Sequence, residues 1–299
     1  MFKKLMARFG KGAAEVDLVL DKNQFRLGEN IQGKLVIKGG EAEQKINKIE
    51  VLLKVAIRHD ETESVHTVAT IPIYESFTIH PGEQKEFPFN YSLPFDLLIS
   101  GNHVTYFFST NLDIAGGIDQ KDRDYIEIVC PHPLQMVLDA LNRLGFREKH
   151  DSRKFNGHGQ EFELFPTDFL RGQAEELEFV AAIQPDGVHM LVELDLYSYG
   201  DEKEVKREVF IPKHLLESEE ELVKEIKGIL EDMANYGTGG YFHDHHFSHG
   251  HHGHSSSGLS GVIGGFVAGM AGAMIMDEVV DELFEDDEDD LEDFFEDED

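Results

Sequence analysis

The chain has 299 residues, and its hydrophobic fraction of 40% is sufficient for two domains with proper cores. A formal net charge of −32 repels phosphate backbones, which argues against nucleic acid as a partner. The single cysteine, Cys130, excludes an intramolecular disulfide framework and fits a reducing compartment. No secretory signal is expected, because no apolar segment follows the basic residues at the start of the sequence. We therefore expect a cytoplasmic protein, with membrane association left open.

The first predicted element is a short amphipathic helix in residues 1–12. Its apolar residues share one helical face, and basic residues surround that face. One interpretation is a helix docked on the first domain. The other is a helix that binds a partner or an anionic membrane surface. The residues that would make this contact are Phe2, Leu5, Met6 and Phe9.

Residues 13–130 show the period of two that is typical of β-strands. The clearest alternations are Ile49, Val51, Leu53, Val55 and Ile57, and then Val104, Tyr106, Phe108, Thr110, Leu112 and Ile114. Turn-forming residues separate the strands, as at His80-Pro81-Gly82-Glu83. Many short strands without intervening helices predict an antiparallel β-sandwich.

A helix is predicted in residues 131–146, which we interpret as the interdomain connection. Its apolar face is Leu134, Val137, Leu138, Leu141 and Leu144, and Gly145 would end it. Residues 147–237 return to the strand pattern and predict a second, smaller sandwich. In its hairpin turn at Gln184–Gly187, Pro185 would fix φ and Gly187 would supply a positive φ. Ser218 and Glu221 form a capping box that opens a closing helix.

Residues 238–258 are rich in histidine, glycine and serine. Neutral imidazoles bind transition metals, so this linker could buffer zinc or nickel weakly, or respond to pH. We expect no resident cofactor. The candidate metal ligands are His243, His245, His246, His249, His251, His252 and His254.

Residues 259–276 form an uncharged, glycine-rich segment, interpreted as an apolar helix. Its small residues Gly261, Gly265, Gly269 and Ala273 recur every fourth position, which favours helix self-association or membrane contact. A flexible linker is the competing interpretation. Residues 277–299 form an acidic tail that resists folding alone. Its aromatic residues Phe284, Phe294 and Phe295 suggest docking on a partner or on the body of the protein, and the alternative is a solubilising tail.

Catalytic motifs do not emerge from the sequence, so an enzyme is not expected. Residues Gly28–Lys34 have the spacing of a P-loop, but Leu35 replaces the serine or threonine that would hold magnesium. A strand is also expected after this segment, where a P-loop needs a helix.

Several ordered motifs point to one family. They include Phe2-Lys3-Lys4-Leu5, the segment Gly10–Asp17, Phe25–Glu29, Leu112–Ala115 and Asp122–Ile126. Over residues 1–237 the sequence resembles the stage-zero sporulation-control protein M family. The resemblance implies a mainly β fold with two arrestin-like β-sandwich domains, short helices at the N-terminus, between the domains and after the second domain, and a cytosolic regulatory role. We expect a non-enzymatic adaptor that binds partner proteins. The alternatives are a metal-buffering protein that uses the histidine run and a membrane-tethered scaffold that uses the glycine-rich helix.

Overall fold

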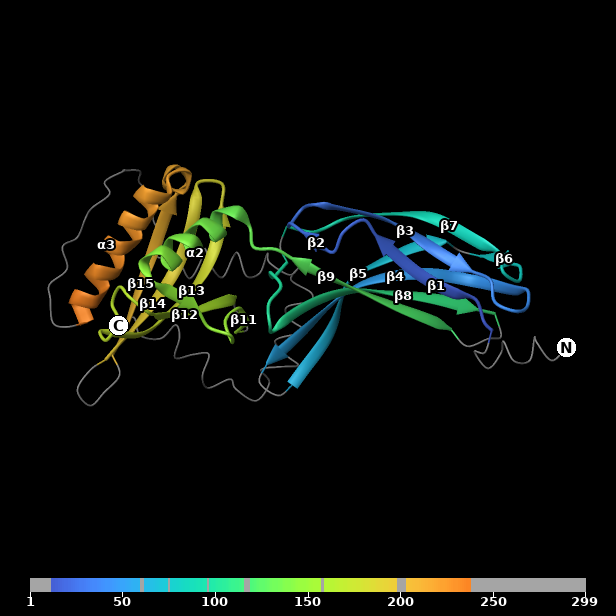
Figure 1. Ribbon diagram of the computed structural model, residues 1–299, viewed down its shortest axis with the longest axis horizontal. Helices are drawn as coiled ribbons and strands as arrows, with labels where there is room; N and C mark the ends of the chain where they lie inside the picture. The colour runs from blue at the N-terminus through green and yellow to red at the C-terminus, as the bar shows by residue number, and fades with distance from the viewer. Residues whose placement is uncertain are drawn as a thin grey trace, which may run out of the picture. The chain divides into compact units, whose positions relative to one another are not determined.

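The computed structural model describes residues 12–59, 62–74, 76–95, 97–115, 119–156, 159–197 and 203–237. They fall into two compact units (Figure 1). The first contains the described residues up to Ser100 together with Val104–Val129. The second contains Gly101–His103 and the described residues from Cys130 onward. The fold is mainly β, as the sequence predicted.

The first unit contains two sheets. A three-stranded sheet has the order β1 (Glu15–Leu20), β3 (Asn30–Lys38) and β7 (Gln84–Ser92). A six-stranded sheet has the order β2 (Gln24–Phe25), β9 (Gln120–Ile128), β8 (Val104–Ile114), β4 (Gln44–His59) and β5 (Thr62–Tyr74), and β6 (Phe77–Ile79) pairs with the start of β4. Neighbouring strands are antiparallel except for β2 and β9, which pair in parallel.

The core of the first unit lies between these two sheets. Leu53 of β4 and Phe108 of β8 are fully buried, in agreement with the predicted alternation. The ring of Phe89 on β7 meets that of Phe108 edge to face, with 5.3 Å between centroids. Since these two strands belong to different sheets, the sheets pack face to face, and the predicted antiparallel sandwich is confirmed.

The second unit contains one six-stranded antiparallel sheet among the described residues. Its order is β10 (Phe146–Glu148), β12 (Gln160–Pro166), β13 (Ala174–Gln184), β14 (Gly187–Leu196) and β15 (Lys203–Pro212), and β11 (Lys154–Phe155) pairs with β12. The helical elements are α2 (His132–Leu144), the 3₁₀ helix η1 (Lys213–Glu217) and α3 (Glu219–Gly237). Figure 1 shows α2 and α3 side by side over this sheet.

The second unit differs from the predicted sandwich in its second layer. Within the described residues, that layer consists of α2 and α3 rather than a second sheet. Val137 of α2 and Ile226 of α3 meet Phe179 and Val192 around a gap of only about 20 Å³. The helix predicted as an interdomain connection therefore packs as part of the second unit, because its apolar face needs the sheet as a partner.

The hairpin between β13 and β14 was predicted correctly, but for the wrong reason. Gln184 pairs with Gly187 across a two-residue turn. The φ angle of Gly187 is not positive. A Cβ atom at this position would instead lie 2.1 Å from the backbone oxygen of Ile211. Glycine is needed here because β15 approaches closely. One half of the predicted capping box is present, since the Ser218 hydroxyl accepts from the Glu221 N–H at 3.5 Å, whereas the Ser218 N–H donates to the Leu215 carbonyl.

Candidate functional site

Strand β5 forms a long edge of the six-stranded sheet. It has 13 residues and pairs with β4 from Ile49 to His59, with bulges near Val68 and Ile73. In the described part of the chain, β4 is its only strand partner. About half of the backbone N–H and C=O groups of an edge strand point away from the sheet, so this edge can accept a further strand.

Most of β5 lacks the charged side chains that discourage another strand from pairing with an edge. Residues 64–74 contain no Asp, Glu, Lys or Arg. Val65 is 46% exposed, and Thr67 and Thr70 are also exposed. On the opposite face, Ser64 and His66 are buried and joined by a hydrogen bond of 2.8 Å between Ser64 Oγ and His66 Nε2. The buried face fixes the strand in place, while the other face presents small β-branched side chains.

The other edges in the two units are shorter or blocked. Strand β15 has charged residues at half of its ten positions. Strand β7 contains Pro88, which lacks a backbone donor. The edge of β1 is covered by Asp122, whose carboxylate accepts from the Leu18 N–H at 3.0 Å. Strand β10 has only three residues. These features blunt an edge against strand addition, and residues 64–74 of β5 have none of them except Pro72 near the end.

Residues 62–74 lie in the region where the sequence predicts β-strands, but no strand was identified at the position of β5. Its abundance of threonine, valine and isoleucine was a usable strand signal. The bulge near Val68 interrupts the alternation of buried and exposed positions, so a search for strict period two passes over the segment.

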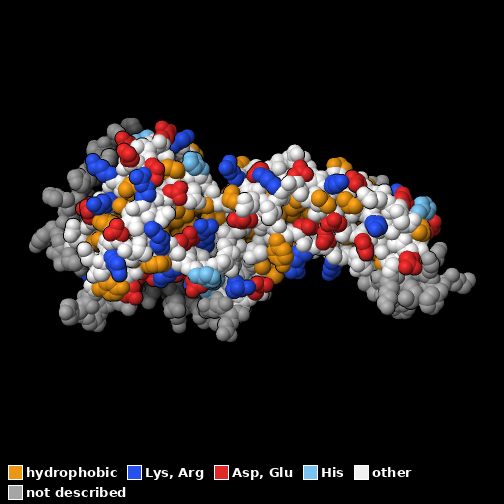
Figure 2. Space-filling model, in the orientation of Figure 1, with side chains coloured by type: hydrophobic (Ala, Val, Ile, Leu, Met, Phe, Trp, Pro, Cys, Tyr) orange, Lys and Arg blue, Asp and Glu red, His pale blue; other side chains and the backbone are white. Residues whose placement is uncertain are grey.

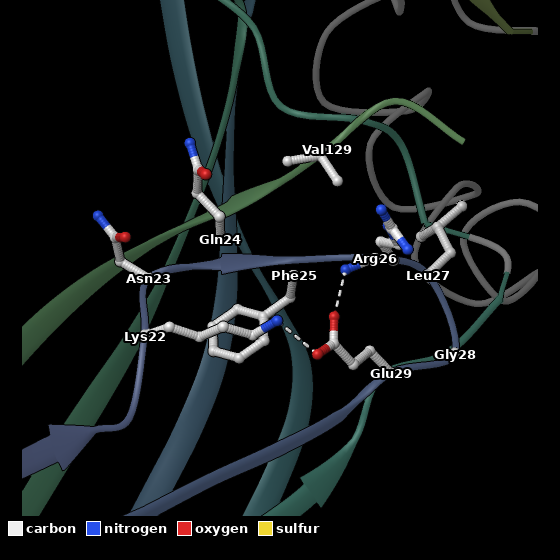
Figure 3. Close-up of a pocket in the computed structure, with 9 residues that line it drawn as sticks. All are labelled: Lys22, Asn23, Gln24, Phe25, Arg26, Leu27, Gly28, Glu29 and Val129. Carbon is white, nitrogen blue, oxygen red and sulfur yellow. Dashed lines mark hydrogen bonds and ion pairs between the residues drawn. The ribbon is translucent and has the colours of Figure 1, made fainter. Parts of the chain in front are cut away.

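A pocket of about 790 Å³ lies in the first unit along β2 and the turn that follows it (Figure 3). The Lys22 side chain crosses the Phe25 ring, with Nζ 5.1 Å from its centroid, and reaches Glu29 Oε1 at 2.5 Å. Glu29 also accepts from the Arg26 backbone N–H at 2.9 Å. The hydrogen bond from Lys22 is the main reason that the pKa of Glu29 lies below its usual value.

The same segment contains the P-loop-like spacing, and the structure confirms that a strand follows it. Strand β3 begins at Asn30, and Gly33 and Lys34 pair with β1 and β7. No helix N-terminus is therefore available at this point to receive phosphate. Gly28 has φ +72°, and a Cβ atom there would lie 2.1 Å from Phe95 Cε1. The positive φ favours glycine at this position, and any other side chain would also have to displace the Phe95 ring.

The sheet of the second unit carries a row of glutamates on the face away from its helices. Glu163, Glu178 and Glu193 lie directly opposite one another on β12, β13 and β14. Lys154 pairs with Glu163 at 3.2 Å, and Lys206 pairs with Glu193 at 3.7 Å. Burial, reinforced by neighbouring carboxylates, raises the pKa of the central Glu178 to about 8. Glu178 therefore titrates about one unit above neutral pH.

Cys130 is half-buried, and burial raises the pKa of its thiol to about 11. The reactive thiolate is consequently a minor species at neutral pH, which is the opposite of what a nucleophilic cysteine needs.

The site residues predicted from the sequence lie outside the described residues. This holds for the helix residues Phe2, Leu5, Met6 and Phe9, for the histidines between His243 and His254, and for the candidates between Gly261 and Phe295. None of the described helices has both the length and the apolar character needed to cross a membrane. Figure 2 shows basic and acidic side chains interspersed on its visible face.

Comparisons with known proteins agree on one family. Residues 2–197 match the family described as SpoOM protein. The sporulation-control protein spo0M of Bacillus subtilis (strain 168) is 35% identical over 252 residues, which cover 78% of this chain and 97% of that protein. The crystal structure of Spo0M from Bacillus subtilis matches with a TM-score of 0.58 and 32% identity, covering 74% of this chain and 98% of the other. The chain therefore belongs to the SpoOM protein family.

Proposed function

We propose that this protein is a non-enzymatic regulatory adaptor that binds partner proteins by strand addition to β5. The observation that carries the proposal is the edge of β5, which is long, has no Asp, Glu, Lys or Arg over residues 64–74, and has no second strand partner in the described residues. A relative of 35% identity is named for sporulation control, which supports a regulatory role for this chain.

The length of β5 sets the size of the contact. At about 3.3 Å per residue, a strand of this length offers about 40 Å of backbone. An added strand would gain main-chain hydrogen bonds along this edge, and alternate side chains would provide specificity. The fitting partner is an extended segment of another protein whose small or β-branched side chains lie beside Val65, Thr67 and Thr70.

The double variant Val65→Lys/Thr70→Lys tests the proposal. Both side chains are exposed, so the substitutions leave the core intact. Lysine on an edge strand opposes strand addition by charge and by the desolvation that pairing would require. The matched control is Val19→Lys, because Val19 is 40% exposed and lies on β1, an edge that Asp122 already covers.

The measurement combines partner capture from cells with hydrogen exchange. We expect the full chain and Val19→Lys to capture the same proteins, and the double variant to lose them. In the captured complex, backbone amides of β5 should exchange more slowly than in the unbound chain. Capture that survives in the double variant, or protection that appears elsewhere and leaves β5 unchanged, would refute strand addition.

A further inference from the structure

Three aspartates of the first unit gather where the two sheets meet. Asp17 lies on β1, and Asp122 and Asp124 lie on β9. Their carboxylate oxygens all lie within 4.8 Å of one another. The hydrogen bond from the Leu18 N–H to Asp122 Oδ2, 3.0 Å long, holds β1 against β9 at this point. Asp122 and Asp124 are two residues apart on one strand, so they point to the same face.

Two buried oxygen atoms, one in this cluster and one on the neighbouring strand, have no hydrogen-bond partner in the structure. One is Asp124 Oδ2. The other is Thr110 Oγ1, which belongs to a residue with 0% exposure. Thr110 is directly opposite Asp122 in the pairing of β8 with β9, so its side chain points from the same face of the sheet. Buried oxygens of this kind are costly unless something coordinates them.

Arg123, the basic residue between Asp122 and Asp124, directs its side chain elsewhere. The Arg123 guanidinium lies over the Phe107 ring at 4.3 Å and donates to the Tyr125 hydroxyl at 3.3 Å. Phe107 and Tyr125 are opposite each other on the other face of the sheet.

Two other clusters of carboxylates in the described residues have lysine partners that compensate part of their negative charge. Glu163, Glu176 and Glu178 have Lys149 and Lys154 as ion-pair partners. Glu193, Asp195 and Glu204 have Lys206. The aspartate cluster has three carboxylates and no ion pair with a lysine or arginine within the described ranges. Among the three groups, it is the one whose charge calls for an external cation.

We propose that Asp17, Asp122 and Asp124 bind one calcium ion, with the Thr110 hydroxyl as a neutral oxygen beside it. All donors are hard oxygen atoms, which Ca²⁺ prefers. Ca²⁺–oxygen distances of about 2.3–2.6 Å allow two ligands on opposite sides of the ion to be about 5 Å apart. The present carboxylates meet this limit without moving. Asp17 is exposed, so water can complete the coordination.

Bound calcium would tie β1 of the three-stranded sheet to β9 of the six-stranded sheet. The site is separable from the strand-addition edge, because β8 and β4 stand between β9 and β5. Failure of one proposal therefore does not imply failure of the other.

The test is calcium titration of the full chain by isothermal calorimetry after metal removal. Asp122→Asn/Asp124→Asn removes two charged ligands but keeps an oxygen that can accept from Leu18. Glu193→Gln/Glu204→Gln is the matched control, because it removes the same charge from a group that already contains a lysine. All three proteins keep the histidine run and the acidic tail, so weak binding by those segments cancels in the comparison.

We expect one calcium site in the wild type and in the control, and a loss of affinity at that site of more than about 100-fold in the aspartate variant. Calcium at 100 times its dissociation constant should raise the melting temperature of the wild type by about 5 °C or more. Without calcium, the aspartate variant loses repelling charges but also one of the two oxygens with which Asp122 accepts from the Leu18 and Arg123 N–H groups, so its melting temperature serves only to show that it folds. Equal calcium binding by all three proteins, absence of a stoichiometric site, or tighter binding of Mg²⁺ than of Ca²⁺ would overturn the proposal.

Discussion

Replacing Glu178 with glutamine should stabilise the second unit at neutral pH and above. Glu178 is the centre of the glutamate row on β12, β13 and β14, between Glu163 and Glu193. The lysine ion pairs of the row are at its ends, on Glu163 and Glu193. Glutamine has nearly the same shape as glutamate and cannot ionise, so the substitution isolates the effect of the charge.

The sign and size of the effect follow from the pKa of Glu178. It rises from 4.5 to about 8 on folding, mainly through burial. The unfolded chain therefore loses this proton at lower pH than the folded chain does. The resulting penalty is absent below about pH 4.5, grows as the pH rises, and is constant above about pH 8. At pH 7 it has an upper limit of about 3 kcal/mol, which solvent screening of a half-buried group reduces to roughly 1–2 kcal/mol.

The assay is urea unfolding followed by circular dichroism at several pH values. Among the described residues, both α-helices belong to the second unit, so the helical signal reports on that unit. Measurements from about pH 5.5 to 8.5 avoid the isoelectric point near 4.7. Glu178→Gln should gain free energy of unfolding over the wild type, and the gain should increase with pH. Glu175→Gln, an exposed neighbour on the same strand, is the control and should show no such trend. A gain that is the same at both ends of the range, or a variant less stable than the wild type at pH 8, would refute the reasoning.

Three further outcomes are expected. Gly187→Ala should lower the free energy of unfolding by about 1–3 kcal/mol, because its Cβ would lie 2.1 Å from the Ile211 oxygen, and an unchanged denaturation midpoint would contradict this close approach. Gly228→Ala in α3 should raise it by about 0.5–1 kcal/mol, because the added Cβ meets nothing within 4 Å, and a loss of stability in the same assay would count against the helix packing described above. Cys130, with a thiol pKa of about 11, should react with iodoacetamide at pH 8 on the order of 100-fold more slowly than an unhindered cysteine peptide, and equal rates would show that the thiol is not buried as described.

Local patterns in the sequence determined much of the fold. The alternation from Ile49 to Ile57 predicts a strand with one buried face, and the structure confirms the buried positions. The apolar face of α2 and the Ser218 cap of α3 were also readable. These features depend on residues a few positions apart, so periodicity and capping rules are sufficient to find them.

Tertiary structure alone decided the features on which the two proposals rest. Whether β5 is an edge depends on which strands pair with it, and no segment of β5 encodes that by itself. The aspartates meet although Asp17 and Asp122 are more than 100 residues apart in the chain, because β1 of one sheet contacts β9 of the other where the two sheets pack together. Gly187 likewise owes its requirement to Ile211, a residue of the next strand. Sequence determined the elements through short-range periodicity, and the packing of those elements determined which backbone edges and carboxylates are brought together.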